Sequence, residues 1–315
     1  MKRFITKMKI GFQINDIKTL NFKTDSTLPI ILESQKRKNK NYYFLPSSLT
    51  YKNGSVYAEI REIYFNDNKL EKYSLGKIQH TNLVNFNHIF IRQDPPYNME
   101  YVSSMHLLEQ LKGSTKFINH PRGIRNAPEK ISMLNYKKII PPTIITRSKR
   151  EVDYFVKKHG KSVIKPLYGN GGDSIFLLNT KDENYNQITE RFIDQHNEPF
   201  IVQKYLSDIK NGDKRVILIN GEPIAALRRI PKKNEIRSNI HVGGNCEAIN
   251  LSRQDLKICN EIKDLLKEEG LFFVGIDIIG KYLTEINVTS PTCIQEIKKL
   301  HKIDIAKIIW NKLNV

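Results

Sequence analysis

Residues 272–292 constrain the fold of this chain more than any other stretch. They read FFVGIDIIGKYLTEINVTSPT, in which two runs of β-branched and apolar residues flank a short glycine-containing turn, a pattern typical of a buried β-hairpin. Asp277, Glu285 and Asn287 interrupt these runs. Because strand side chains alternate between faces, Glu285 and Asn287 point to the same side. If residues 280–282 form a three-residue loop, Asp277 lies opposite Glu285 and the side-chain oxygens converge.

Such a group of oxygens suits a metal ion. Two carboxylates side by side on a buried sheet face repel each other and are costly to desolvate. A divalent cation removes both costs, and two carboxylates with one amide fit Mg²⁺, which keeps its other positions for water and phosphate oxygens. We therefore predict that Asp277, Glu285 and Asn287 are metal ligands. The simpler alternative is a pair of strand acids at a solvated sheet edge.

The turn Ser290-Pro291-Thr292 follows the hairpin directly and offers two hydroxyls and free backbone N–H groups beside the same spot. These donors suit the anionic end of a substrate. Cys293 comes next, and with no evident histidine partner it is expected to be a buried residue rather than a nucleophile.

Length and composition describe a globular chain. Its 315 residues, 39% hydrophobic and 27% charged, suffice for about two or three modules with their own cores. No run of about 18 apolar residues is present, so we expect no membrane span. The basic residues 1–8 lack the apolar region of a secretory signal, and Met8 is an alternative start. Three scattered cysteines fit neither a disulfide framework nor a zinc site, which favours a cytoplasmic location.

The formal charge of +18 and the pI near 9.6 raise the question of nucleic-acid binding. The lysines are spread along the chain, however, and neither a basic tail nor an arginine patch interleaved with aromatic residues is present. We therefore expect no nucleic-acid partner. A small polyanionic substrate accounts better for local clusters of positive charge.

The first part of the chain alternates strand and helix patterns, which predicts a small open sheet. The expected strands cover residues 9–14, 42–45, 56–65, 88–91 and 117–119, and the expected helices cover residues 27–36 and 101–111. Ligands of such sheets bind just beyond the strand ends, where Arg92 and Asp94 follow residues 88–91. The alternative is that Arg92 and Asp94 pair with each other in a rigid Pro-Pro turn.

The next part carries a phosphate-binding pattern. The first module is expected to end near residue 125, and residues 126–133, with Glu129 and Lys130, are predicted to start a helix. A strand over residues 143–145, a helix over 149–159 and a strand over 162–167 follow. The loop GNGG at residues 169–172 then aims backbone N–H groups at phosphate oxygens, with Lys165 just upstream. This loop is not a P-loop, because it lacks the GK[ST] ending and opens no helix.

The remaining segments complete a nucleotide-binding pattern. The polar end of a strand over residues 200–206 presents backbone groups to a base edge. Antiparallel strands over residues 215–219 and 223–227 place Arg215 and Arg229 at strand ends, where Arg215 alone is equally an ordinary salt-bridge residue. Residues 230–245 form a long loop with three cations and a Gly-Gly pair, which predicts a lid over an anionic substrate. Helices are expected over residues 252–269, capped by Ser252, and over 303–313.

These motifs occur together and in this order in one family. They are Arg92-Gln93-Asp94-Pro95-Pro96, Glu129-Lys130, Ile164-Lys165-Pro166-Leu167, Gly169-Asn170-Gly171-Gly172, Gln203-Lys204-Tyr205-Leu206, Gly212-Asp213-Lys214-Arg215-Val216, Arg229-Ile230-Pro231, Arg237-Ser238-Asn239, Gly243-Gly244, Gly275-Ile276-Asp277-Ile278-Ile279-Gly280 and the stretch from Leu283 to Thr292. The chain closely resembles the bacterial glutathione synthetases, which are ATP-grasp ligases, from about residue 8 to near its end. The hairpin with its Thr-Ser-Pro-Thr tail is the most specific part and the Gly loop the least.

The resemblance implies an α/β architecture, with an ATP-grasp fold preceded by a small Rossmann-like domain. The implied domains are residues 1–125 for substrate, 126–203 with the phosphate loop, and 204–315 with the lid and metal site. The implied reaction joins γ-glutamylcysteine and glycine through an acyl phosphate, giving ADP and phosphate. It uses ATP and Mg²⁺, with Mn²⁺ as a substitute, in a cytoplasmic homotetramer. The chain departs from the family's usual residues at Gln93, Lys232, Lys233 and Asn245.

The resemblance also assigns roles to individual residues. The metal ligands are Asp277, Glu285 and Asn287, and the catalytic residues are Arg215, Arg229 and Lys165. The nucleotide is held by Lys130, Lys165, Gly169, Gly171, Gly172, Gln203, Lys204, Tyr205, Leu206 and Asp213. The dipeptide is held by Arg92, Arg215, Arg237, Ser290 and Thr292.

Two other functions compete with this interpretation. The first is an ATP-grasp ligase that joins a different acid and amine, and the residue 92–96 and 290–292 motifs argue against it. The second is a basic nucleic-acid-binding protein with a degenerate ligase core, and the intact set of metal ligands argues against that.

Overall fold

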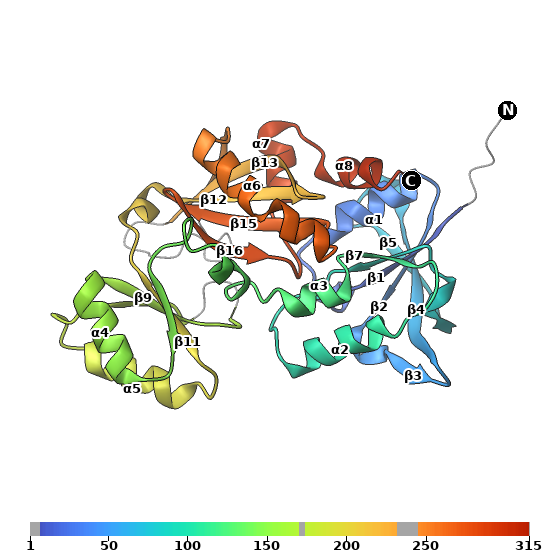
Figure 1. Cartoon of the computed structure of the whole chain (residues 1–315). Helices are drawn as coiled ribbons and strands as arrows, with labels where there is room; N and C mark the ends of the chain where they lie inside the picture. The colour runs from blue at the N-terminus through green and yellow to red at the C-terminus, as the bar shows by residue number, and fades with distance from the viewer. Residues whose placement is uncertain (1–6, 170–173, 232–244, 315) are drawn as a thin grey trace.

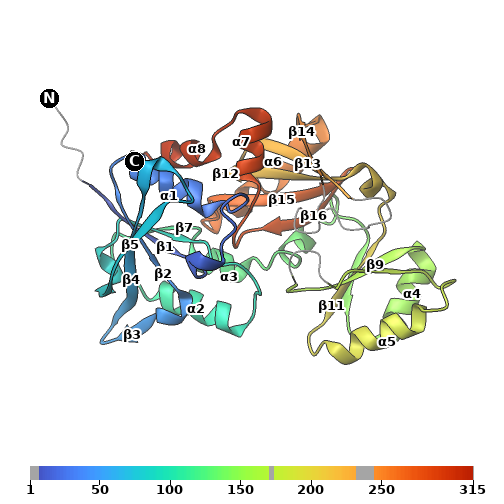
Figure 2. The same cartoon turned by 180° about the vertical axis from the view of Figure 1, so that it is seen from behind.

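The computed structural model describes residues 7–169, 174–231 and 245–314. Within these ranges the strands form three sheets, one in each successive part of the chain (Figures 1 and 2). No helix of the described residues combines the length and the apolarity needed to cross a bilayer. The mixed α/β class expected from the sequence is confirmed.

The first sheet has the order β3-β4-β2-β1-β6-β7, and β5 extends it by pairing with β4. Strands β2, β1, β6 and β7 run parallel, as expected for an open sheet of Rossmann type, whereas β3, β4 and β5 pair antiparallel. Its strands are β1 (Lys9–Gln13), β2 (Lys40–Phe44), β3 (Thr50–Lys52), β4 (Ser55–Phe65), β5 (Tyr73–Asn82), β6 (His88–Ile91) and β7 (Lys116–Ile118). Strand β5 was not predicted from the sequence, because half of its residues are exposed, none is buried, and they show no apolar alternation.

Helices cover both faces of the parallel strands. Side chains of β1 and β6 alternate, so that Ile10 and Phe90 join a core with one pair of helices while Ile89 joins a core with the other pair. The first pair is α1 (Thr27–Lys36) and α8 (Ile305–Lys312), and the second is α2 (Met99–Glu109) and α3 (Pro121–Asn126). The predicted helix over 27–36 is confirmed.

The C-terminal helix α8 returns to the first sheet and lies beside α1 (Figure 1). The indole Nε1 of Trp310 donates a hydrogen bond of 2.9 Å to the carbonyl of Ile30. The Arg37 guanidinium donates to the Asn311 side chain at 2.5 Å. The two ends of the chain therefore share one core.

The second sheet has the order β10-β9-β11-β8 and is antiparallel throughout. It contains β8 (Thr143–Thr146), β9 (Ser162–Pro166), β10 (Phe176–Leu178) and β11 (Phe200–Lys204), packed against α4 (Lys149–His159) and α5 (Tyr185–Gln195). The expected helix start over residues 126–133 is wrong. Helix α3 ends at Asn126, and Ala127 precedes Pro128, which disfavours helical backbone at the residue before it.

The third sheet has the order β14-β13-β12-β15-β16. Its elements are β12 (Asp213–Ile219), β13 (Glu222–Ile230), β14 (Asn245–Ile249), β15 (Phe273–Ile279) and β16 (Tyr282–Asn287), with α6 (Arg253–Glu268) and α7 (Ile294–His301). The Ser252 cap is confirmed, and it forms a reciprocal capping box with Asp255.

The loop of the β15–β16 hairpin differs from the expected three residues. Ile279 pairs with Tyr282, so only Gly280 and Lys281 lie in the turn, and Gly280 adopts a φ of 57°. A register shift between Asp277 and Ile278 offsets the shorter loop. Asp277 therefore still lies opposite Glu285, as predicted.

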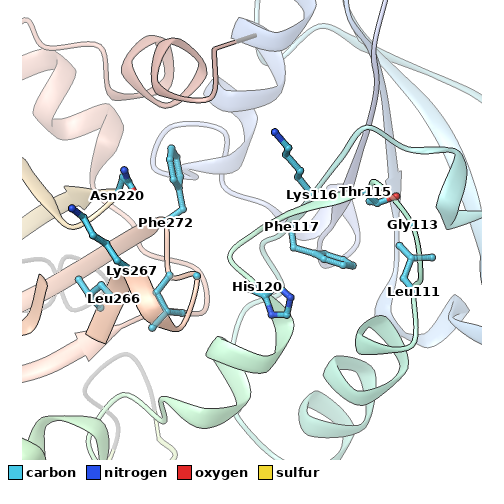
Figure 3. Close-up of a pocket in the computed structure, with 12 residues that line it drawn as sticks. Leu111, Gly113, Thr115, Lys116, Phe117, His120, Asn220, Leu266, Lys267 and Phe272 are labelled. Atoms are coloured by element: carbon cyan, nitrogen blue, oxygen red, sulfur yellow. The ribbon is translucent and has the colours of Figure 1, made fainter. Parts of the chain in front are cut away.

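A hollow of about 490 Å³ lies between the first and third sheets, near the start of β15 (Figure 3). Phe117 and His120 line it from the first module, and Asn220, Leu266 and Phe272 line it from the other side. It contains no residue that the sequence assigns to a site, and the site lies further along β15.

Candidate functional site

One cross-strand row of the third sheet gathers the polar residues. Arg215 on β12 pairs with Asp277 on β15, and Asp277 pairs with Glu285 on β16. The residues next to them, such as Val216 and Ile276, point to the opposite face and are fully buried in the core with α6. The alternation of the strands thus separates an apolar face from a face that carries charges.

Asp277 lies at the centre of this row. The Arg215 side chain donates to both of its carboxylate oxygens, at 2.5 and 2.9 Å, and Arg229 Nη2 lies 2.9 Å from Oδ2. All three residues are at most 5% exposed. Burial alone would raise the pKa of Asp277, but the two guanidinium groups outweigh it and hold that pKa well below its usual range. Asp277 is therefore an ionised, buried carboxylate.

Arg229 joins two carboxylates. Its Nε donates to Asp213 Oδ1 at 2.9 Å, its Nη2 donates to Asp213 Oδ2, and the same Nη2 contacts Asp277. Burial lowers the pKa of Arg229, but Asp213 and Asp277 reverse this and raise it well above its ordinary value. Two arginines and two aspartates therefore neutralise each other, and this pairing offsets the cost of burying all four charges.

Two lysines approach Glu285 from the second module. Lys130 Nζ lies 3.7 Å and Lys165 Nζ 3.8 Å from Glu285 Oε1. Lys130 Nζ also donates to the carbonyl of Gly169 at 2.6 Å, so it ties the start of the glycine loop to the third sheet. Burial lowers the pKa of Lys165, and Glu285 opposes that shift. Lys130 and Lys165, which the resemblance assigns to the nucleotide phosphates, thus lie next to Glu285, which it assigns to the metal.

The predicted metal ligands fit a hard divalent cation by their chemistry. Asp277 and Glu285 face each other across the hairpin, and Asn287 Nδ2 lies 3.5 Å from Asp277 Oδ2. No cluster of three or more His, Cys, Asp or Glu side chains among the described residues could hold a metal, so the set depends on the amide of Asn287. Two carboxylates and an amide are oxygen ligands of the kind that Mg²⁺ prefers.

Sequence reasoning gave no role to the Glu129 carboxyl, which the structure places beside this centre. Thr289 Oγ1 donates to Glu129 Oε1 at 2.9 Å, and the Ile286 N–H donates to the Glu129 carbonyl at 3.0 Å. Burial raises the pKa of Glu129, and the nearby Glu285 adds to the rise. In the sequence, the only indication that Glu129 lies near the site was its position next to Lys130.

The turn after β16 meets the end of β6. Ser290 Oγ donates to Asp94 Oδ1 at 2.5 Å. Arg92 donates through Nε to Thr27 Oγ1 at 3.1 Å and through Nη2 to the Pro291 carbonyl at 2.8 Å. The alternative in which Arg92 and Asp94 hydrogen-bond to each other is therefore wrong, because each side chain contacts the 290–291 turn instead.

Gly275 lies between the Arg215–Asp277 row and the 290–292 turn. A Cβ atom at this position would lie 3.2 Å from both the Arg215 Cδ and the Pro291 Cβ. The missing side chain lets the row of Arg215 and Asp277 and the 290–292 turn both lie close to β15. Thr292 lies at the end of that turn, with its Oγ1 3.7 Å from Cys293 Sγ. Cys293 is buried, as expected, and burial raises its pKa.

The residues assigned to the base edge lie on β11 and just after it. Gln203 is buried and donates to Thr143 Oγ1 at 3.0 Å. The N–H groups of Lys204 and Tyr205 donate to carbonyls of neighbouring segments, and Leu206 follows them. No hydrogen bond of the described residues joins this segment to the Asp277 centre. Gly171, Gly172, Arg237 and most of the expected 230–245 lid lie outside the described residues.

Solved structures with low sequence identity share the fold of this chain. D-cycloserine synthetase DcsG covers 96% of this chain, and the chain covers 99% of it, with a TM-score of 0.67 at 12% sequence identity. The match to the ATP-grasp ligase PsnB, in complex with a minimal precursor, covers 98% of this chain and 99% of the PsnB chain, with a TM-score of 0.64 at 16% sequence identity. At these identities the likeness establishes the ATP-grasp fold alone.

Sequence comparison is more specific. Residues 8–125 match the family model described as the prokaryotic glutathione synthetase N-terminal domain, and residues 129–302 match its ATP-grasp domain. Glutathione synthetase of Mesorhizobium japonicum is 41% identical over 305 residues, which cover 97% of each chain. The Agrobacterium fabrum enzyme is 39% identical over 304 residues, covering 96% of this chain and 95% of its own. The chain therefore belongs to the prokaryotic glutathione synthetase family of ATP-grasp ligases.

Proposed function

We propose that the centre around Asp277 is the site at which this ligase joins γ-glutamylcysteine to glycine with ATP. The observation that carries the proposal is the row of Arg215, Asp277 and Glu285, met from the second module by Lys130 and Lys165. Alternating charges of this kind support a site at which the phosphates of a nucleotide, a divalent cation and a carboxylate come together.

Amide formation from a carboxylate and an amine is unfavourable in water. Transfer of the γ-phosphoryl group of ATP to the cysteinyl carboxylate gives an acyl phosphate, and attack by the glycine amine then releases phosphate. The first step brings several negative charges together, so the protein must supply positive charge that is already in place. Mg²⁺, or Mn²⁺ in its place, supplies such charge when bound to Asp277, Glu285 and Asn287.

Each cationic side chain has a distinct part in this scheme. Lys130 and Lys165 contact the nucleotide phosphates, and Arg215 and Arg229 neutralise the transferred phosphoryl group. The bidentate pairing with Asp277 keeps Arg215 oriented before substrate arrives, so little reorganisation is needed during the reaction. Gly169, Gly171 and Gly172 cover the phosphates, and residues 230–245 close over the intermediate to exclude water.

The remaining assignments concern the ends of the substrates. Gln203, Lys204, Tyr205 and Leu206 border the adenine, with Asp213 at the nucleotide. Arg92, Arg237, Ser290 and Thr292 contact the dipeptide, together with Arg215. The contacts of Arg92 and Asp94 with the 290–291 turn support this, since they join the first module to the catalytic row.

We further propose three domains, over residues 1–125, 126–203 and 204–315, each containing one of the three sheets. A cytoplasmic homotetramer with no nucleic-acid or membrane partner is the assembly that the family resemblance supports.

The function is tested by following ADP release from the purified chain. We expect release to require both γ-glutamylcysteine and glycine, with the tripeptide as product. A panel of other acids and amines distinguishes this reaction from that of another ATP-grasp ligase. ADP release driven better by a different acid and amine pair would refute the proposed substrates.

A further inference from the structure

The segment before helix α1 brings a carboxylate to the 290–292 turn. Asp25 Oδ1 accepts hydrogen bonds from the N–H groups of Thr27 and Leu28, both at 2.7 Å, at the start of the helix. The other oxygen, Oδ2, takes no hydrogen bond from any group in the described residues, and the Asp25 residue is partly exposed. One oxygen therefore shapes the backbone while the other stays available.

Contacts on both sides fix this segment against the proposed dipeptide site. Gln295 Nε2 donates to the Asp25 carbonyl at 2.6 Å, and the Ile294 N–H donates to Ser26 Oγ at 3.4 Å. Arg92 bridges the next residue, Thr27, and the Pro291 carbonyl. Asp25 thus lies in the junction between the first sheet and the turn that ends the catalytic hairpin.

The charges at this junction do not balance. Arg92 is the nearby cation, whereas Asp25 and Asp94 both contribute carboxylates that interact with it and with each other. Burial raises the pKa of Asp25, and the proximity of Asp94 adds to the rise although Arg92 opposes it. Arg92 is 4% exposed, and its Nη1 is buried without a hydrogen-bond partner. Among the described residues, the junction therefore holds two carboxylates that each have an oxygen with no hydrogen bond, and one guanidinium nitrogen without a partner.

A ligand that carries an ammonium group beside a carboxylate group has the charges to pair with the carboxylates and with the arginine of this junction. The γ-glutamyl residue of the proposed substrate carries both groups on its α-carbon, at the end of the dipeptide remote from the reacting carboxylate. We propose that Asp25, together with Asp94, binds the α-ammonium group of the γ-glutamyl residue and so determines specificity for that end of the substrate. This inference rests on the proposed function, and it assigns a role to a residue outside the motifs that carry the family resemblance.

The test compares γ-glutamylcysteine with N-glutarylcysteine, in which a hydrogen replaces the α-ammonium group. The analogue lacks the cation that would pair with Asp25 and Asp94, and a site built to bind that group rejects a substrate without it, so we expect the wild-type kcat/KM to be at least about a hundredfold lower for it. Asp25→Asn retains Oδ1 as the helix cap, so the variant is expected to fold. It is expected to lose about tenfold or more in kcat/KM for γ-glutamylcysteine, mainly through KM, and to change by less than about threefold with the analogue.

Two further variants sharpen the result. Asp94→Asn is expected to shift the preference in the same direction as Asp25→Asn. Asp16→Asn is the matched control, because Asp16 Oδ1 also accepts from a backbone N–H, at 3.0 Å to Lys18, but Asp16 is exposed and no hydrogen bond of the described residues joins its side chain to the 290–292 turn. This control is expected to retain wild-type constants for both substrates.

The outcomes separate the two proposals. If the wild-type chain does not turn over γ-glutamylcysteine, the proposed function is wrong and this inference is wrong with it. If the wild-type chain is active and Asp25→Asn keeps its full preference for the ammonium-bearing substrate, only the assignment of Asp25 is overturned. A collapse of that preference with an unchanged KM for ATP supports the assignment.

Discussion

Asn119 joins the first module to β15 and to the end of β16, and its replacement is the most direct test of how the modules are held together. Its Nδ2 donates to the carbonyls of Phe273 and Val288, both at 2.8 Å, and its Oδ1 accepts from the Phe273 N–H at 2.7 Å. Asn119 is buried, so Asn119→Ala leaves three backbone groups of β15 and the end of β16 without partners.

The magnitude follows from those three bonds. A buried hydrogen bond contributes about 1 kcal/mol, and a buried group left unpaired adds a desolvation penalty, so Asn119→Ala should lower the free energy of unfolding by about 3–5 kcal/mol. Asn119→Asp should cost at least as much, because its carboxylate accepts from Phe273 but faces two carbonyl oxygens. Urea titration followed by the fluorescence of Trp310, the single tryptophan, measures the change.

Asn126→Ala is the matched control. Asn126 donates to Glu269 across the same junction, but at 3.4 Å and on the surface, so its loss should cost less than about 0.5 kcal/mol. If the free energy of unfolding of Asn119→Ala lies within about 1 kcal/mol of the wild-type value, the three hydrogen bonds of Asn119 do not hold the modules together and the reasoning is wrong.

Three further outcomes are expected. Arg215→Ala and Glu285→Ala should each lower turnover at least about a hundredfold with the far-ultraviolet circular dichroism unchanged, and near-normal turnover of either purified variant would exclude its role. Excess chelator should stop ADP release, and added Mg²⁺ or Mn²⁺ should restore it; persistent activity in chelator would rule out the metal site. Burial would raise the pKa of Asp255, but hydrogen bonds from Lys214 and Ser252 outweigh it and lower that pKa in the folded protein. The ionised carboxylate therefore stabilises the fold relative to Asp255→Asn at pH values above the ordinary pKa of 3.8. This stabilisation is lost as the pH falls through the lower pKa of the folded state. Acid titration of unfolding in both proteins measures this difference, and a constant difference down to about pH 2 would contradict it.

Much of the local structure could be predicted from the sequence, because short-range rules govern it. The pattern of residues 27–36 indicates helix α1, and Ser252 with Asp255 marks the start of α6. The hairpin pattern with a three-residue loop predicted Asp277 opposite Glu285, and that pairing is confirmed although the loop length is not. The turn is one residue shorter than expected, and a register shift in the pairing of β15 with β16, where Asp277 pairs with Glu285 but Ile278 pairs with Leu283, offsets the difference. Sequence patterns do not reveal such shifts.

The tertiary structure decided which of these elements meet. Arg215 and Asp277 are 62 residues apart, and their pairing depends on β12 lying next to β15, which follows from sheet order rather than from local propensity. The same holds for Asp25 near Arg92, for Glu129 at Thr289 and for α8 on α1. Periodicity specifies which face of an element is buried. The partner that buries it is chosen by packing between distant segments, and those contacts gather single charges into a site.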